Sequence, residues 1–128
     1  MTMTTDGSAV LATRSRTLAI GLSALLLSIP PISHVELVPD TDSLFEAIEE
    51  NGPILIIVDT ALLGNELPET SREIRRLSPG SLNVLLSENV AEFRELVYHS
   101  DDTVIMKGTE PARLARTLEF LLNDHIVA

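Results

Sequence analysis

A short run of aliphatic residues that ends in an aspartate constrains the fold of this chain more than any other segment. Residues 54–58 read Ile-Leu-Ile-Ile-Val, follow an Asn-Gly-Pro turn signal and lead directly into Asp59. A continuous aliphatic run of this length, bounded by turn residues, is typical of a strand covered on both faces in a parallel sheet. In open α/β sheets, binding and chemistry gather beyond the carboxyl ends of the strands. Asp59 is therefore the first candidate functional residue.

The rest of the chain alternates short apolar strands with amphipathic helices. The predicted strands cover residues 9–12, 34–38, 54–58, 82–86 and 103–106. The predicted helices cover residues 17–28, 43–50, 69–77 and 90–99, with a last helix that begins at Pro111. This alternation predicts a three-layer α/β/α sandwich, in which five helices cover a five-stranded parallel sheet with right-handed crossovers.

The predicted domain occupies nearly the whole chain. We expect residues 1–8 to form a disordered N-terminal tail, residues 9–123 to form the domain, and residues 124–128 to form a frayed C-terminal tail. Residues 61–68, with their Gly-Asn turn signal, are expected to be a loop. Asp40 and Asp42, directly before the second helix, are expected to cap it.

Composition excludes several classes of function. The chain has 128 residues and a formal net charge of −10, from 19 acidic and 9 basic side chains. Nucleic acids and anionic membranes both require a basic surface, so neither is an expected partner. The chain contains no cysteine, which excludes disulfides and thiolate chemistry. Its three histidines are scattered along the sequence, so no zinc site is expected.

The first predicted helix admits more than one interpretation. Arg14 and Arg16 precede an apolar run over residues 18–27, a pattern that also occurs in secretory signals. The predicted strand upstream and the Pro-Pro sequence downstream favour an internal helix, and we expect a cytoplasmic protein. The helix is apolar on nearly every side, which predicts either burial between neighbouring helices or a self-association surface that forms a homodimer.

Three successive strands of the predicted sheet end in residues with related chemistry. The third strand ends at Asp59, the fourth at Ser87 and the fifth at Lys107. A carboxylate can act as a nucleophile toward phosphorus. The oxygen charge that develops during phosphoryl transfer then needs fixed cationic and hydrogen-bonding partners. An aspartate, a hydroxyl and a lysine at one edge of a sheet meet these requirements.

With these residues in place, the sequence resembles the receiver (CheY-like) domain of bacterial two-component response regulators. The resemblance extends over residues 9–122 and is greatest to receivers that precede helix-turn-helix output domains. It includes Gly-Leu-Ser-Ala-Leu-Leu at residues 21–26 and Val-Ile-Met-Lys-Gly-Thr-Glu-Pro at residues 104–111. The resemblance implies a flavodoxin-like fold with strand order 2-1-3-4-5. It also implies that Asp59 accepts a phosphoryl group from a histidine kinase, and that Ser87 and Lys107 contact the phosphoryl oxygens.

The sequence departs from the family pattern at the metal site and at the aromatic switch. Family members hold magnesium with two acidic residues at the end of the first strand, where this chain has Thr13 and Arg14. Magnesium usually needs one or two carboxylates besides phosphate and water, so we expect a degenerate site and no cofactor. The Arg14 guanidinium is a candidate to occupy the metal position. Val104 replaces the aromatic residue that reports phosphorylation in typical members.

These departures lead to three alternative functions. The preferred one is a pseudo-receiver that contacts protein partners, a sensor kinase or a downstream regulator, with phosphorylation weakened or lost. In this reading Asp59 is an electrostatic anchor paired with Lys107 and Arg14. The second alternative is a working receiver, transiently phosphorylated on Asp59. The third is a flavodoxin-like domain that binds an anion or small molecule near residues 13–16. All three predict binding or signalling rather than an enzyme.

Overall fold

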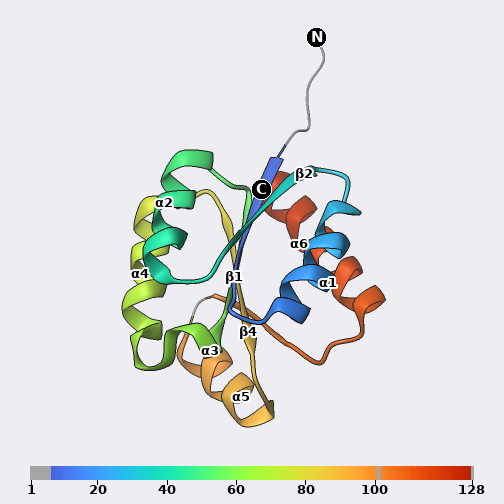
Figure 1. The fold of residues 1–128 in the computed structure, drawn as a ribbon. Helices are drawn as coiled ribbons and strands as arrows, with labels where there is room; N and C mark the ends of the chain where they lie inside the picture. Colours follow the sequence, from blue (N-terminus) through green and yellow to red (C-terminus); the bar gives the residue numbers. More distant parts are fainter. Residues whose placement is uncertain (1–6, 101, 128) are drawn as a thin grey trace.

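Five parallel strands form a single sheet between two layers of helices (Figure 1). The computed structural model describes residues 7–100 and 102–127. Its strands are β1 (Gly7–Ala12), β2 (Ile32–Val38), β3 (Leu55–Asp59), β4 (Leu82–Ser87) and β5 (Thr103–Met106). Their order is β2-β1-β3-β4-β5, and every neighbouring pair is parallel. The predicted flavodoxin-like sandwich is confirmed.

The five predicted helices are all present, and two short helical segments accompany them. The longer helices are α1 (Arg16–Leu27), α2 (Thr41–Asn51), α4 (Leu67–Leu77), α5 (Val90–His99) and α6 (Pro111–Val127). The short segments are α3 (Thr60–Leu63) and the 3₁₀ helix η1 (Gly64–Glu66). Helices α1 and α6 cover one face of the sheet, and α2 to α5 cover the other (Figure 1).

The loop prediction for residues 61–68 was wrong. This segment contains most of α3, all of η1 and the start of α4. Asp59 caps α3, because its Oδ1 accepts the backbone N–H of Ala61 at 3.1 Å. Leu63 is buried in the apolar cluster under α2 and α4, which fixes the turn. Gly64 then ends α3 at a φ of 54°, a left-handed conformation that glycine adopts without a steric penalty.

Both ends of the domain extend beyond their predicted limits. Strand β1 begins at Gly7 rather than Ala9, so Gly7 and Ser8 belong to the sheet, and residues 1–6 lie outside the described part. Helix α6 continues to Val127, where a frayed tail from residue 124 was expected. His125 Nε2 lies 2.8 Å from the carbonyl oxygen of Gly80, a contact that holds the last turn of α6 beside the start of β4.

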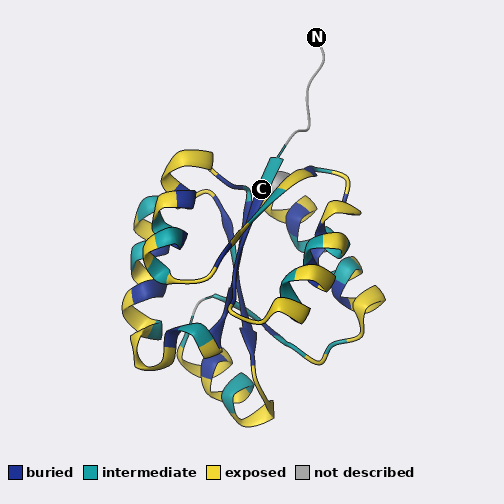
Figure 2. Cartoon of the chain, viewed as in Figure 1, coloured by how far each residue is buried: buried dark blue, intermediate teal, exposed yellow. Residues whose placement is uncertain are grey.

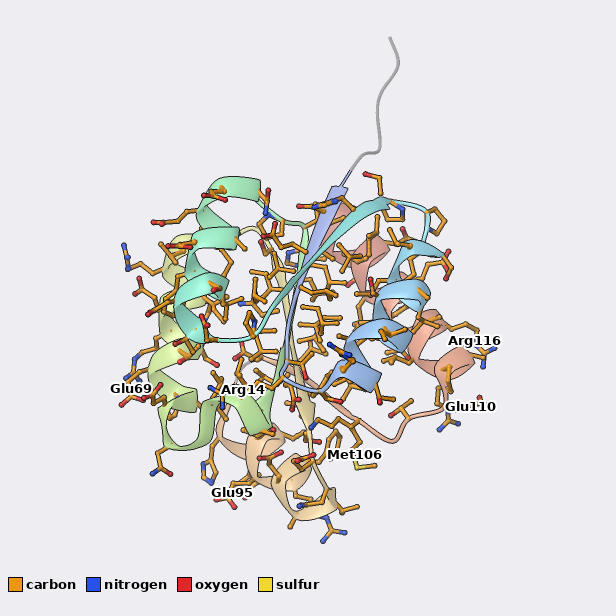
Figure 3. The ribbon with its side chains drawn as sticks, viewed as in Figure 1. Arg14, Glu69, Glu95, Met106, Glu110 and Arg116 are labelled. Atoms are coloured by element: carbon orange, nitrogen blue, oxygen red, sulfur yellow. The ribbon has the colours of Figure 1, made fainter. Side chains whose placement is uncertain are left out.

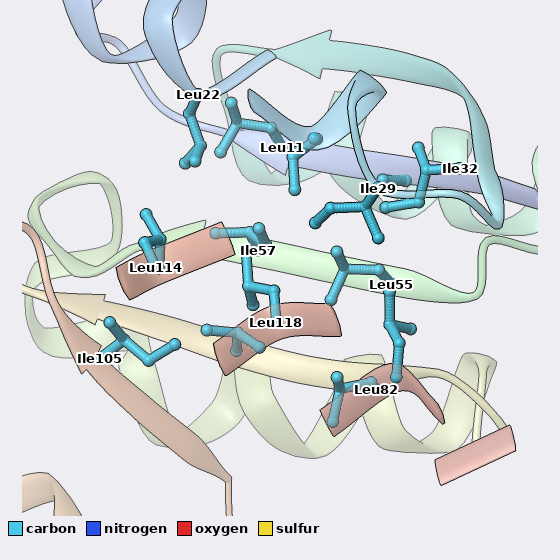
Figure 4. Packing of buried hydrophobic residues seen from close by; sticks show 14 of the residues in the cluster. Leu11, Leu22, Ile29, Ile32, Leu55, Ile57, Leu82, Ile105, Leu114 and Leu118 are labelled. Atoms are coloured by element: carbon cyan, nitrogen blue, oxygen red, sulfur yellow. The ribbon is translucent and has the colours of Figure 1, made fainter. Parts of the chain in front are cut away.

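The central strand β3 is buried at every position, as its aliphatic run predicted. Alternate side chains enter opposite layers: Leu55 and Ile57 pack with α1 and α6, whereas Ile56 and Val58 pack with α2 and α4. Figure 4 shows the first of these clusters, and Figure 2 shows the buried sheet between helices whose outer sides are exposed. Burial on both faces fixes the register of β3 and therefore the position of Asp59 at the carboxyl edge.

Helix α1 is one of the helices of the folded domain, and its outer side is apolar and exposed to solvent. Leu22 and Leu26 are buried, whereas Ile20 is 66% exposed and Leu27 is 51% exposed. The predicted burial of this helix on more than one side was wrong, and self-association through it stays a prediction. Within residues 7–100 and 102–127, no helix combines the length and apolar character needed to cross a membrane.

Adjacent leucines of α1 provide a direct test of this packing. Leu26→Ala should lower the free energy of unfolding by about 2–5 kcal/mol, because it removes a fully buried side chain from the cluster under α1 and α6. Leu27→Ala is the matched control on the exposed side and should change stability by about 0.5 kcal/mol or less. Urea unfolding followed by circular dichroism measures both; equal losses would contradict the assignment of inner and outer sides.

Candidate functional site

The carboxyl edge of the sheet brings together the three residues predicted from the strand ends. Asp59 ends β3, Ser87 ends β4, and Lys107 directly follows β5. The parallel register pairs Asp59 with Leu86 and Ser87 with Met106, so the three residues come from adjacent strands. Asp59 is 3% exposed and Ser87 is fully buried, whereas the Lys107 side chain is 22% exposed.

Three donors hold the Asp59 carboxylate. Lys107 Nζ lies 2.7 Å from Oδ1, which also accepts the backbone N–H of Ala61. The Thr13 hydroxyl donates to Oδ2 at 2.7 Å, and the Thr13 oxygen in turn accepts the N–H of Ser15 at 3.1 Å. Both carboxylate oxygens are therefore hydrogen-bonded, as a buried charge requires. The predicted pairing of Asp59 with Lys107 is present.

Lys107 bridges two carboxylates. Its Nζ lies 2.8 Å from Glu88 Oε1 in addition to its contact with Asp59. Partial burial lowers the pKa of Lys107, but the hydrogen bonds and charges of Asp59 and Glu88 outweigh this effect and raise the pKa above its ordinary value of 10.5. The ammonium group therefore stays charged at neutral pH, and both of its carboxylate partners lie within the protein.

The Ser87 hydroxyl has no hydrogen-bond partner among the described residues, although it is completely buried. This hydroxyl does not cap the helix that follows, α5. Asn89 caps α5 instead, because its Oδ1 accepts the N–H of Glu92 at 2.9 Å. An unpaired buried hydroxyl is unfavourable by about 1–3 kcal/mol, and such groups need an explanation in a native structure.

Sequence reasoning missed Thr60, Asn89 and Glu92, whose side chains order the loop after β4. Glu92 Oε1 accepts the N–H of Glu88 at 2.7 Å and the hydroxyl of Thr60 at 2.7 Å. These contacts connect the loop to the residue that follows Asp59. Asn89 and Glu92 have the spacing of a capping box, a sequence signal that could have identified Glu92. The reach of Thr60 to Glu92 depends on tertiary structure and has no local signal.

Arg14 does not take part in this site. Its side chain is exposed, and its Nε donates to the carbonyl oxygen of Pro39 at 3.3 Å (Figure 3). The predicted pairing of Arg14 with Asp59, and its placement in the metal position, were therefore wrong. Thr13 offers a hydroxyl that donates to Asp59. Among the described residues no three His, Asp or Glu side chains gather closely enough to hold a metal, and the donors beside Asp59 do not fit magnesium.

Two other residues that the sequence singled out, Asp40 and Val104, stabilise the fold. Asp40 caps α2, because its Oδ1 accepts the N–H of Ser43 at 2.8 Å, and this hydrogen bond to the backbone lowers the pKa of Asp40 below its ordinary value. The predicted cap is confirmed for Asp40. Val104 in β5 is partly buried and packs against the apolar cluster on the α2 to α5 side of the sheet.

Removal of the Lys107 ammonium should destabilise the fold strongly. Lys107→Met leaves the Asp59 carboxylate buried without its cation, and we expect the free energy of unfolding to fall by about 3 kcal/mol at pH 7. The double variant Asp59→Asn/Lys107→Met removes both charges and should recover part of this loss. Urea unfolding of the wild type, the two single variants and the double variant measures the coupling. Additive losses would show that the two residues do not interact.

The raised pKa of Lys107 predicts a specific alkaline dependence. The pair contributes its full stabilisation below about pH 10.5, and this contribution is lost as the pH rises through the higher pKa of the folded state. Wild-type stability should therefore fall more steeply above about pH 10.5 than the stability of Lys107→Met. Urea unfolding between about pH 9 and pH 12 tests this, and parallel curves for the two proteins would contradict it.

Comparison with known proteins identifies the fold. No family model matches the sequence, and no curated protein matches it either. Many solved structures match, including three response regulator structures that are each less than 25% identical to this chain. A LuxR-family response regulator from Aurantimonas sp. SI85-9A1 has 18% identity and a TM-score of 0.77, over 93% of this chain and 86% of that one.

Two further receivers have the same architecture. The isolated receiver domain of RcsB from Salmonella enterica serovar Typhimurium, determined with the phosphomimetic BeF3−, has 18% identity and a TM-score of 0.77, over 92% of this chain and 89% of that one. A receiver domain from Bacteroides fragilis has 22% identity and a TM-score of 0.73, over 93% and 96%. The chain therefore has the fold of the response regulator receiver (CheY-like) domains.

Proposed function

We propose that the chain is a receiver-like module of a two-component phosphorelay system that acts by contact with protein partners, with phosphorylation of Asp59 weakened or lost. The observation that carries this proposal is that three internal donors already bond the Asp59 carboxylate. Thr13, Ala61 and Lys107 donate to its two oxygens, so the candidate nucleophile already has the partners of a structural ion pair. Three of the roughly four lone-pair sites of the carboxylate are thus occupied, two on Oδ1 and one on Oδ2, so a phosphoryl donor would compete with these contacts.

The chemistry around Asp59 supports the same conclusion. Phosphoryl transfer requires cations that neutralise the developing oxygen charge. Thr13 and Arg14 supply no carboxylate ligand for magnesium, and Arg14 donates to Pro39 instead. Lys107 is the cation beside Asp59, and Glu88 shares it. A phosphoryl donor that approaches Asp59 therefore meets two carboxylates and one ammonium group, an arrangement that repels an anion.

The proposed partners are proteins, either a sensor kinase or a downstream regulator. The net charge of −10 disfavours nucleic acid and anionic membrane as partners of this domain. The exposed apolar side of α1 keeps a homodimer among the proposed assemblies. The proposed role is signalling rather than catalysis.

A working phosphoacceptor remains the second candidate, and the Ser87 hydroxyl favours it. This hydroxyl is buried at the end of the strand beside Asp59 and lacks a partner among the described residues. A phosphoryl oxygen on Asp59 would supply one. By contrast, no observation favours an anion site at residues 13–16, because Thr13 bonds Asp59 and the Ser15 hydroxyl oxygen accepts the N–H of Leu18 to cap α1.

Incubation with acetyl phosphate and magnesium, followed by intact-mass measurement, tests the proposal. We expect the wild type to gain no phosphoryl group, because Thr13 and Arg14 supply no carboxylate ligand for magnesium at the end of β1. Thr13→Asp/Arg14→Asp restores two carboxylates at the end of β1 and removes the hydroxyl that occupies Asp59, so this variant should gain one phosphoryl group. Adding Asp59→Asn should abolish the gain.

The wild-type result decides between the two candidates. A magnesium-dependent gain of one phosphoryl group by the wild type, absent in Asp59→Asn, would replace the pseudo-receiver with the working phosphoacceptor. Circular dichroism of each variant establishes that it is folded before the masses are compared.

A further inference from the structure

A pocket between α4 and α5 lies apart from the Asp59 site. It has a volume of about 210 Å³, and none of Asp59, Ser87 and Lys107 lines it. The two helices cover the same face of the sheet (Figure 1). The base of the pocket includes Leu85 of β4 and Leu96 of α5, which are 2% and 8% exposed. The pocket therefore offers a small apolar surface below the level of the two helices.

Basic side chains gather around this apolar base. Arg72, Arg75 and His99 line the pocket, and no described Asp or Glu residue does. The chain as a whole has 19 acidic and 9 basic residues, so a pocket lined by two arginines and by no described carboxylate runs against its composition. Both arginines come from α4, and the histidine ends α5. The pocket is complementary in charge to an anion.

The arginines are not saturated by internal partners. Among the described residues, no carboxylate oxygen lies within 4.0 Å of the Arg72 guanidinium. Arg75 Nη1 lies 3.7 Å from Asp102 Oδ1, a distance longer than a hydrogen bond, and its side chain is 42% exposed. Arg76, on the same helix but outside the pocket, pairs closely with Glu73 at 2.6 Å. Internal ion pairing therefore accounts for Arg76 and leaves Arg72 unexplained.

The helix dipole does not explain Arg72 either. Basic residues near the end of a helix are favourable because they offset its partial negative charge, which accounts for Arg75 and Arg76 in the last turn of α4. Arg72 lies in the middle of that helix, where the effect of the dipole has faded. Next to Arg72, Ser71 is only 7% exposed and lines the same pocket, which adds a hydroxyl to its wall.

We propose that this α4–α5 pocket binds a small organic carboxylate. The apolar body of the ligand rests on Leu85 and Leu96, and its carboxylate bonds to Arg72 and Arg75, with Ser71 as a further donor. Arginine suits this role because its planar guanidinium matches a carboxylate with two parallel hydrogen bonds. The volume of about 210 Å³ lies below the range of roughly 300–1,000 Å³ typical of drug-sized ligands, so the ligand is small.

The proposed site lies apart from Asp59 but shares strand β4 with it. Leu85 lies two residues before Ser87 on β4, and α5 follows the loop that contains Glu88. A bound carboxylate would therefore contact α4, β4 and α5 together and stabilise their arrangement. The proposal does not depend on whether Asp59 accepts a phosphoryl group.

Titration of the full 128-residue chain with benzoate tests the site. Amide chemical shifts report the location of binding, and isothermal calorimetry reports the dissociation constant. We expect saturable shifts at Leu85, Leu96 and their neighbours. Benzamide has the same shape without the charge and should bind at least about tenfold more weakly, because it lacks the charge-assisted hydrogen bonds. Inorganic phosphate, which has charge without an apolar body, should also bind more weakly.

Arg72→Gln and Arg76→Gln form a matched pair on the exposed surface of α4. Arg72→Gln should weaken benzoate binding by about tenfold or more, whereas Arg76→Gln should leave it within about twofold of the wild type. Three results would overturn the proposal: no saturable shifts around Leu85 and Leu96, equal binding of benzamide and benzoate, or equal losses in the two variants. Phosphate binding as tight as benzoate binding would show a general anion site and also reject a carboxylate pocket.

Discussion

The ion pair between Asp59 and Lys107 is the interaction on which the carboxyl edge of the sheet depends. Burial makes the Asp59 carboxylate unfavourable unless cations and donors surround it. Lys107 comes from the end of β5 and Thr13 from the end of β1, so the donors that stabilise one carboxylate also connect β1, β3 and β5. Glu88 extends the connection to the end of β4 through the same ammonium group. Four strand ends thereby share one electrostatic network.

The contacts that stabilise the Asp59 carboxylate also use groups that a phosphoryl-transfer reaction would need. A phosphoacceptor needs a carboxylate oxygen that an incoming phosphorus atom can reach, together with cations free to bind the transferred oxygens. Here Thr13 and Lys107 occupy separate oxygens of Asp59, and Glu88 takes a further donor of the lysine. Of Asp59, Ser87 and Lys107, only Ser87 has a side chain that lacks a hydrogen-bond partner within the described residues. An aspartate, a hydroxyl and a lysine thus meet at the strand ends, and the aspartate and the lysine direct much of their hydrogen-bonding capacity to each other.

Periodicity predicted the alternating strands and helices and the shared edge at which Asp59, Ser87 and Lys107 lie, whereas the strand order that makes their strands neighbours was implied by the resemblance to receiver domains. Other details depend on contacts distant in sequence. Residues 60–66 became helical because Asp59 caps them and Leu63 reaches the core. An exposed side chain such as that of Arg14 has many rotamers of similar energy, so its hydrogen bond to the Pro39 carbonyl oxygen could not be predicted from the sequence. Sequence spacing specified which residues end the strands, but not which of them share donors.

Charge distribution connects the two regions of the molecule. In an acidic chain, each cation close to a carboxylate is neutralised locally, as Lys107 is by Asp59 and Glu88, and Arg76 by Glu73. Arg72 has no such carboxylate partner among the described residues, and the pocket that it lines contains no described carboxylate. The two regions therefore differ in the charges that line them: two arginines at the pocket, and Asp59 and Glu88 around Lys107 at the carboxyl edge. Strand β4 borders the pocket through Leu85 and ends beside Asp59 at Ser87, so the proposed carboxylate site and the Asp59 network share one buried strand.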